Sequence, residues 1–388
     1  HPPALGVRTH ITDDRLFLPY VTAAYLRATE DLSVLCVQVP YLENVDIPEG
    51  HEDWYGQAKP SSVLEPLHLH NLRAIDSLRY GEHGLPLIGG GDWNDGMNGL
   101  GVENRGESVW LGFFLSAVIR DYAPYCAPKE AERLLKKREE LMDNLEEHAW
   151  DGAWYLRAWF DGGVPLGSRE SPECRIDLVV QAWAALAGAK RADQALDSAL
   201  SHLLDERAGI LKLLDPPFDG KTDPGYIRAY PPGIRENGGQ YTHAALWFVM
   251  ALFKAGRTEL AWKLFFMLLP TTHSRDERLA RHYRVEPYVV AADVAGGEHS
   301  GRGGWTSYSG SASLLWSLGV ETLLGFEKRG NRVRLTPTAP SHWEGFTLSY
   351  RHGQTTYLLK AVRGARDDGW IDLKDDGGTH EAIYALKS

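Results

Sequence analysis

The stretch IDLVVQAWAALAG, residues 176–188, is apolar around almost its whole circumference when it is drawn as a helix. A helix of that composition is buried between neighbours, because it has no polar face to turn to water. The segment at 130–148 is different, since Ala131, Leu134, Leu135, Leu141 and Leu145 form one apolar stripe among lysines and glutamates. Helices of these two kinds, one buried on all sides and one exposed to solvent on a single face, predict a double-layered helical barrel.

Apolar residues recur at helical spacing along the first 325 residues. The spacing predicts helices at 15–30, 63–80, 107–122, 130–148, 176–188, 191–204, 240–255, 258–269 and 310–324. Beyond 326 the period becomes two, because Phe346, Leu348 and Tyr350 alternate with polar residues before a turn signal at His352. We therefore expect a mainly α-helical barrel over 1–325 and a small antiparallel β-module over 326–388.

Composition and charge narrow the classes of partner. The 388 residues carry 41 basic and 52 acidic side chains, a net charge of −11, which argues against nucleic acid or an anionic membrane surface as the main partner. No apolar run approaches the ~18 residues that cross a bilayer.

Cys36, Cys126 and Cys174 lack CxxC spacing, which favours free thiols in a reducing, cytoplasmic setting. His68 and His70 face different ways on a predicted helix, so no metal site is expected.

Three predicted loops, at 81–106, 205–239 and 270–309, exceed the ~12–15 residues that are usual in a compact domain. They are rich in Gly, Trp, Tyr, Asp, Arg and His, a composition that favours function over disorder. In a helical barrel, such loops lie at one rim, where several can form a single pocket.

The densest group of reactive side chains is GGGDWNDGMN at 89–98. Its glycines allow a tight turn close to a ligand, and Trp93 can stack on a pyranose ring. A carboxyl beside aromatic surface loses solvation, so such a group can stay protonated and act as a general acid. The alternative is an Asx-rich turn with Trp93 as its hydrophobic plug.

Three further stretches combine polar side chains with a predicted helix start. In GYIRAYPPGIRENGGQYTH at 225–243, Arg235, Glu236 and His243 can bind an anion and hydroxyl groups; the alternative is a surface ion pair and a structural histidine. GRGGWTSYSGSA at 301–312 offers hydroxyls to an oxyanion, or a plain N-cap at Ser309. In GVRTHITDD at 6–14, Arg8 can bind phosphate or hydroxyls, while an aspartate caps the helix.

In this order, the four stretches resemble the inverting glycoside phosphorylases of the cellobiose/chitobiose phosphorylase family, glycoside hydrolase family 94. Within it, the sequence is most similar to the phosphorylase-like C-terminal region of cyclic β-1,2-glucan synthases. Further shared motifs are GESVWLGFFL at 106–115, AWDGAWYLRAWFDGGVPLGS at 149–168 and YRVEPYVVAADV at 283–294. The resemblance covers nearly the whole chain, and it implies an (α/α)6 barrel without the family's N-terminal β-sandwich and first helices.

The resemblance also implies roles for individual residues. It makes Asp95 the general acid. The substrate-binding residues that it implies are Arg8, Asp14, Trp93, Tyr230, Arg235 and Glu236. The phosphate-binding residues that it implies are His243, Ser309 and Gly310, with Ser309 standing where the family usually has threonine.

These roles describe an inverting phosphorolysis. An inverting glycosidase needs a second carboxylate to activate water, whereas inorganic phosphate is already a nucleophile and needs an anion pocket instead. The predicted reaction releases α-glucose 1-phosphate from a β-linked glucan, with phosphate as co-substrate and no metal or organic cofactor. Two alternatives stay open. One is an inverting hydrolase whose second carboxylate is Glu236 or Glu286, and the other is a non-catalytic, carbohydrate-binding piece of a larger synthase.

The expected partners are therefore an oligosaccharide and phosphate. As part of a synthase, the chain would be tethered to a membrane glycosyltransferase region and would face the cytoplasm at the inner membrane. The sequence does not fix the oligomeric state, and a homodimer stays open.

Overall fold

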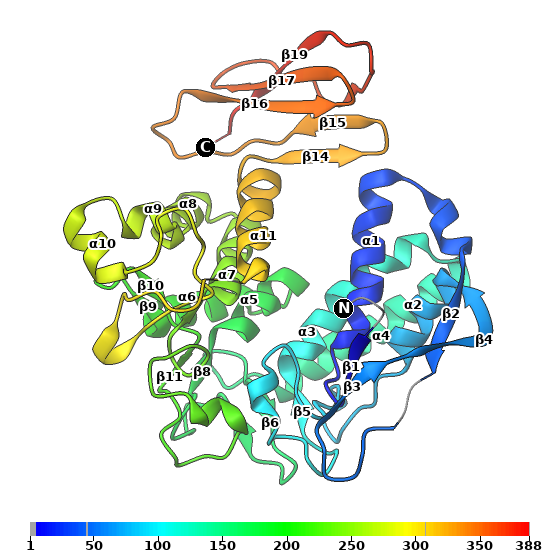
Figure 1. The fold of residues 1–388 in the computed structure, drawn as a ribbon, viewed down its shortest axis with the longest axis vertical. Helices are drawn as coiled ribbons and strands as arrows, with labels where there is room; N and C mark the ends of the chain where they lie inside the picture. Colours follow the sequence, from blue (N-terminus) through cyan, green and yellow to red (C-terminus); the bar gives the residue numbers. More distant parts are fainter. Residues whose placement is uncertain (1–4, 44–45, 307, 388) are drawn as a thin grey trace.

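The computed structural model describes residues 5–43, 46–306 and 308–387. A row of helices, each packed on the next, forms the middle of the molecule (Figure 1). In order along the row they are α1 (Phe17–Thr29), α3 (Val109–Tyr122), α5 (Leu178–Ala187), α7 (Thr242–Lys254) and α11 (Ser309–Ser317). A second row covers the first, in the order α2 (Leu67–Asp76), α4 (Pro128–His148), α6 (Ala192–Leu203) and α8 (Thr258–Leu268). The helices thus alternate along the chain between an inner and an outer layer.

Burial separates the two layers as the hydrophobic patterns predict. Every residue of α5 is buried, whereas α4 buries only Leu134, Leu141 and Leu145. At the start of α5, the Asp177 carboxylate accepts hydrogen bonds from two free backbone N–H groups, and Gly188 ends the helix in the left-handed region at φ 87°. The predicted double layer of helices is therefore confirmed.

Two predicted helices have different bounds in the structure. The segment at 63–80 begins as strand β4 (Lys59–Pro66), and helix α2 starts only at Leu67, because the residue before a proline is biased toward extended backbone. The segment at 310–324 is helix α11 followed by a π-helical turn at Leu318–Leu323. The expected loop at 270–309 contains two short helices, α9 (Pro270–His273) and α10 (Glu277–Tyr283).

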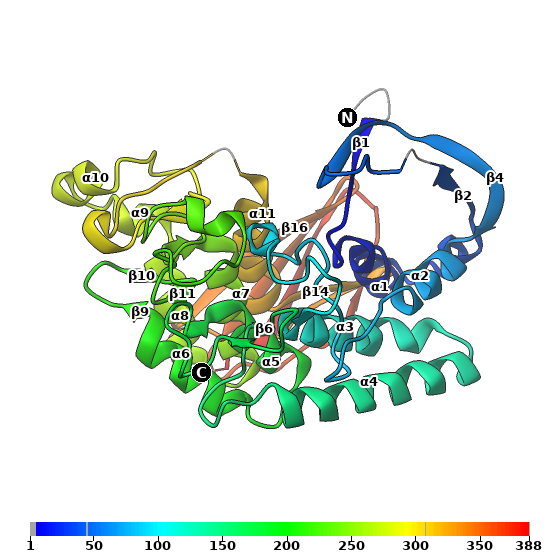
Figure 2. The ribbon, with the colours of Figure 1, turned by 90° about the horizontal axis from the view of Figure 1, so that it is seen from below.

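A pair of β-ribbons that the sequence analysis did not predict flanks α1 and α2 (Figure 2). Strand β1 (Leu5–Thr9) pairs with β3 (Asp53–Gln57), and β2 (Gln38–Glu43) pairs with β4, both antiparallel. We call the β1–β3 pair the arm.

Short strands tie the loops together beside the starts of the inner helices. Strands β5 (Glu107–Ser108), β8 (Ile176–Asp177) and β12 (Gln240–Tyr241) directly precede α3, α5 and α7. Strand β5 pairs with β6 (Ala158–Trp159), β8 with β11 (Leu214–Asp215), and β12 with β13 (Asp293–Val294). In addition, β6 pairs with β7 (Pro165–Leu166), and β9 (Leu204–Asp205) pairs with β10 (Ile210–Leu211). The long loops therefore gather at the N-terminal ends of the inner helices.

The C-terminal module consists of two three-stranded sheets at one end of the helical layers (Figure 1). One sheet, with β14 (Phe326–Arg329), β15 (Arg332–Leu335) and β18 (Ile371–Asp372), is antiparallel as expected. In the other, β16 (Gly345–His352) and β17 (Thr355–Val362) form an antiparallel hairpin, but β19 (Thr379–Ala385) runs parallel to β17. The purely antiparallel expectation is wrong for that pair, because the chain visits β18 in the other sheet before it returns. Among the described residues, no helix combines the length and apolar character needed to cross a membrane.

Candidate active site

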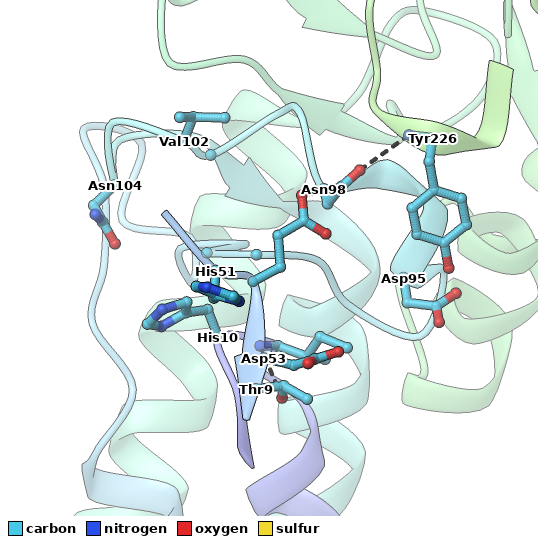
Figure 3. A pocket seen from close by; sticks show the side chains of 14 residues that line it. Thr9, His10, His51, Asp53, Asp95, Asn98, Val102, Asn104 and Tyr226 are labelled. Carbon is cyan, nitrogen blue, oxygen red and sulfur yellow. Dashed lines mark hydrogen bonds between the residues drawn. The ribbon is translucent and has the colours of Figure 1, made fainter. Parts of the chain in front are cut away.

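A cavity of about 430 Å³ opens beside Asp95, the first residue of a 3-10 turn at Asp95–Met97 (Figure 3). The end of β1 and the arm residue Asp53 form one wall, the loop after Gly89 forms the floor, and Tyr226 stands opposite the arm. Three segments that are far apart in the sequence thus meet at one exposed carboxyl group.

The two acids of DWND have different environments. The Asp92 carboxylate is buried and accepts two hydrogen bonds, at 2.6 and 2.7 Å, from the Arg157 guanidinium. It also accepts a hydrogen bond from the hydroxyl of Ser108 at 2.6 Å. Asp95, in contrast, is exposed to the cavity. Asp92 is therefore a structural residue, and Asp95 is the acid of this motif that can reach a ligand.

Glycine is required where this loop turns. Gly91 has φ 132°, a conformation that other residues rarely adopt, and a Cβ there would lie 3.2 Å from the Asp95 Cα. At Gly89, with φ 58°, a Cβ would lie 2.8 Å from the His10 carbonyl oxygen. The triple glycine thus lets the loop pack against the arm and turn back sharply enough to present Asp95.

Tyr226 and Asn98 fix the wall of the cavity opposite the arm. The Tyr226 hydroxyl donates a hydrogen bond to Asp95, and burial together with that bond raises the pKa of Tyr226. The Asn98 amide donates to Glu52 at 2.8 Å and accepts from the Tyr226 backbone N–H at 3.0 Å. Because Tyr226 keeps its proton, it acts as a hydrogen-bond donor that orients the Asp95 carboxylate.

Arg235 and Glu236 lie next to this wall. Their side chains form an ion pair at 3.2 Å, and the Arg235 guanidinium stacks on the Tyr230 ring at 4.8 Å. Burial raises the pKa of Glu236, and the negative charge of Asp95 raises it further. This electrostatic coupling places Glu236 near Asp95 and joins three predicted substrate-binding residues to the acid.

An aromatic cluster continues from this loop to the start of α7. The Trp93 ring packs edge-on against Tyr241 and His243, with centroids 5.5 and 5.8 Å away, and it also contacts Trp247. Half-buried Trp93 thus belongs to an aromatic cluster at the start of α7. Burial lowers the pKa of His243 to about 4, so its imidazole is neutral near pH 7. The Nδ1 atom of His243 is buried and has no hydrogen-bond partner among the described residues.

The N-termini of α7 and α11 lie side by side. Tyr241 precedes α7 and Tyr308 precedes α11, and their rings lie 6.1 Å apart and share a side-chain hydrogen bond. Ser309, at the first position of α11, is exposed, and Gly310 follows it. The Thr242 N–H at the start of α7 donates to the Ala292 carbonyl at 2.8 Å. The remaining N–H groups and the dipoles of two helix N-termini form a favourable environment for an anion.

Arg8 and Asp14 are not among the residues that line the Asp95 cavity. Arg8 lines a neighbouring cavity of about 610 Å³ and forms an ion pair with Asp46 at 3.5 Å. Asp14 is exposed and accepts a hydrogen bond from the Thr9 hydroxyl at 3.0 Å. Since Thr9 lines both cavities, the two residues lie near the site, but the structure does not bring them into contact with the acid.

Several residues of this region belong to no motif of the sequence. His51 and Glu52, just before strand β3, and the arm residue Asp53 line the cavity. Arg157 stands alone between apolar residues in AWYLRAWF at 153–160, and it is fully buried. An isolated arginine in such a stretch is a signal that could have predicted a buried acidic partner.

Asp13 is a buried carboxyl beside the Asp92–Arg157 pair. Burial raises its pKa from the usual 3.8 to about 8, and repulsion from Asp92 and Asp14 adds to the effect. Folded Asp13 therefore keeps its proton at neutral pH, whereas the unfolded chain loses it.

Asp13→Asn is expected to flatten the pH dependence of stability. Between about pH 4 and pH 8 the folded protein holds one more proton than the unfolded chain, so the free energy of unfolding falls as the pH rises. Asparagine has no such proton, so the variant should gain stability relative to the wild type across that window. Urea unfolding of both proteins from pH 4 to 8 measures the difference, and parallel curves would contradict the assignment.

Comparisons with known proteins identify the family of the chain. The family model "Glycosyl hydrolase 94 superfamily, catalytic domain" matches residues 3–325. The cyclic beta-(1,2)-glucan synthase NdvB of Rhizobium meliloti (strain 1021) is 44% identical over 372 residues, which are 93% of this chain and 13% of that protein. Solabiose phosphorylase of Paenibacillus borealis is 31% identical over 369 residues, 92% of this chain and 45% of that protein. The chain thus spans less than half the length of these relatives.

Solved structures show a likeness of fold alone. A GH78 family rhamnosidase of Bacillus sp. GL1 aligns over 97% of this chain and 34% of that one, with a TM-score of 0.54 and 13% identity. Because the family model covers most of its length, the chain belongs to the glycosyl hydrolase 94 superfamily.

Proposed function

We propose that this chain is an inverting glycoside phosphorylase that acts on β-linked glucans and releases α-glucose 1-phosphate. The observation that carries the proposal is the position of Asp95. It is an exposed carboxyl in a cavity, hydrogen-bonded by Tyr226 and coupled to Glu236. The phosphorylases among its relatives support the same class of reaction.

In the proposed reaction, protonated Asp95 donates its proton to the glycosidic oxygen while a phosphate oxygen attacks the anomeric carbon from the opposite face. The bond between that carbon and the glycosidic oxygen breaks, and the configuration at carbon inverts. In the reverse direction, the Asp95 carboxylate removes the proton from the acceptor hydroxyl. Inorganic phosphate is a co-substrate, and the reaction as proposed uses no cofactor.

We assign phosphate to the adjoining N-termini of α7 and α11. There His243 Nδ1, which has no hydrogen-bond partner in the described part of the chain, and the Ser309 hydroxyl accompany the N–H groups of Gly310 and its neighbours. Neutral His243 takes part as a hydrogen-bond donor, and a bound dianion would favour its protonation. Arg235, Glu236, Tyr230 and Trp93 are assigned to the sugar sites.

The relative with 44% identity acts in cyclic β-1,2-glucan synthesis by its name, and we propose β-1,2-glucan as the substrate on that basis. We further propose that the double layer of helices belongs to an (α/α)6 barrel. Since the match spans 13% of that synthase, the chain would work beside a membrane glycosyltransferase region on the cytoplasmic side.

The test is the phosphate dependence of product release from β-1,2-gluco-oligosaccharides and a panel of β-linked disaccharides. Glucose 1-phosphate should form only when phosphate is present, and NMR should show the α anomer. Undiminished glucose release without phosphate would favour the hydrolase alternative, for which buried Glu236 beside Asp95 is the better-placed second carboxylate. Calorimetric sugar binding without turnover at any phosphate concentration would favour the binding-module alternative.

A further inference from the structure

Three potential metal-ligating side chains meet in the outer layer of helices. His68 lies on α2, Cys126 lies just before α4, and Glu130 lies in the first turn of α4. One ligand atom from each lies within 4.8 Å of the other two. None of the three is among the residues that line the two cavities near Asp95, so the cluster is independent of the proposed function.

The cluster has the donor set that zinc prefers. An imidazole nitrogen, a thiolate sulfur and a carboxylate oxygen bind Zn²⁺ at about 2.0–2.3 Å, so neighbouring ligand atoms in a tetrahedral site lie roughly 3.3–3.6 Å apart. His68 Nε2 already lies 3.2 Å from Glu130 Oε2. The remaining separations can close by side-chain rotation, because all three side chains are only partly buried.

A hydrogen bond behind His68 supports ligation through Nε2. Its other ring nitrogen, Nδ1, lies 2.8 Å from the hydroxyl oxygen of buried Tyr122, which also accepts a hydrogen bond from the Asn71 amide. Metal-bound histidines usually make such a bond with their second nitrogen, which orients the ring and fixes the tautomer. The Tyr122 hydroxyl would accept the Nδ1–H bond once Nε2 binds a metal ion.

We propose that His68, Cys126 and Glu130 form a zinc site with one position open to water, which links α2 to the start of α4. Binding breaks the Cys126 S–H bond, forms a zinc–sulfur bond and releases the proton to solvent, with no change of oxidation state. No local spacing in the sequence predicts this site, because its ligands come from separate segments.

Cadmium titration of the intact protein tests the site, because sulfur-to-cadmium charge transfer absorbs in the ultraviolet and reports thiolate ligation. The wild type should give a saturable band at one equivalent, which Zn²⁺ displaces. Cys126→Ser should lose the band, and Cys36→Ser, a change at an exposed cysteine outside the cluster, should keep it. A band that survives in Cys126→Ser, or no saturable band in the wild type, would overturn the proposal.

Two further variants keep the thiol and the fold. Glu130→Gln preserves a residue that can serve at the same capping position of α4. Tyr122→Phe removes only the hydroxyl behind His68. Each should weaken cadmium binding by about 10–100-fold or more, since even outer-layer partners contribute that much to metal affinity. Zn²⁺ should also raise the unfolding temperature of the wild type but not that of Cys126→Ser; unchanged affinity in both variants would contradict the ligand assignment.

Discussion

Asp95→Asn is expected to lower the rate of phosphate-dependent glucose 1-phosphate release by about 10²–10⁴-fold, the usual contribution of a general acid. Asparagine has nearly the same shape and can still face Tyr226, but it cannot transfer a proton to the glycosidic oxygen. Because Asp95 is exposed and holds no buried charge partner, the unfolding temperature should stay close to that of the wild type.

A matched control lies on the same loop. Glu103 is exposed, is not among the residues that line the cavity, and pairs with Arg105 at the surface. Glu103→Gln makes the same acid-to-amide change and should leave the rate unaltered. A folded Asp95→Asn protein with an unchanged rate would refute the assignment of the acid, whereas a loss in both variants would point to an effect of the loop.

Arg157→Leu is expected to cost about 3–5 kcal/mol in the free energy of unfolding. The guanidinium lies between the Asp92 carboxylate, at 2.6 and 2.7 Å, and the Asp177 carboxylate, at 3.4 Å, with all three side chains at most 1% exposed. Leucine would leave two buried acids without a cation. Urea unfolding measures the loss.

Arg169→Leu is the control for this change. Its pair with Asp151 is at the surface, with the Arg169 side chain 59% exposed, so its loss should cost no more than about 1 kcal/mol. The double variant Asp92→Asn/Arg157→Leu should be less destabilised than the sum of its single changes, because it removes both the arginine and the Asp92 charge that the arginine neutralises. Equal, small losses for the two arginines would show that the buried network does not stabilise the fold.

The layers of helices could be predicted because burial leaves a periodic trace in the sequence. Segment 176–188 is apolar all round and became the enclosed helix α5, and segment 130–148 carries one stripe and became α4 on the outside. The strands of the arm could not be predicted in this way. Strand β3 is half-exposed on one face and fully exposed on the other, so no apolar alternation marks it.

The site could be predicted in its parts but not in its arrangement. Residue type and spacing alone do not distinguish Asp92 from Asp95. In the structure, Arg157, which lies 65 positions beyond Asp92, binds Asp92 and leaves Asp95 exposed. Similarly, Arg8 belongs to a motif with Asp14, yet it lines a separate cavity and pairs with Asp46 on a segment that carries no motif. Pairings over such distances depend on the packed fold, which periodicity does not encode.

The Arg157 guanidinium joins two parts of the protein that are distant in the sequence. Arg157 holds Asp92, in the loop that presents the proposed acid, and Asp177, which begins helix α5. The loop that carries Asp95 and the start of helix α5 are therefore anchored by the same buried ion. A substitution at Arg157 is expected to disturb both segments at once, however far apart they lie in the sequence.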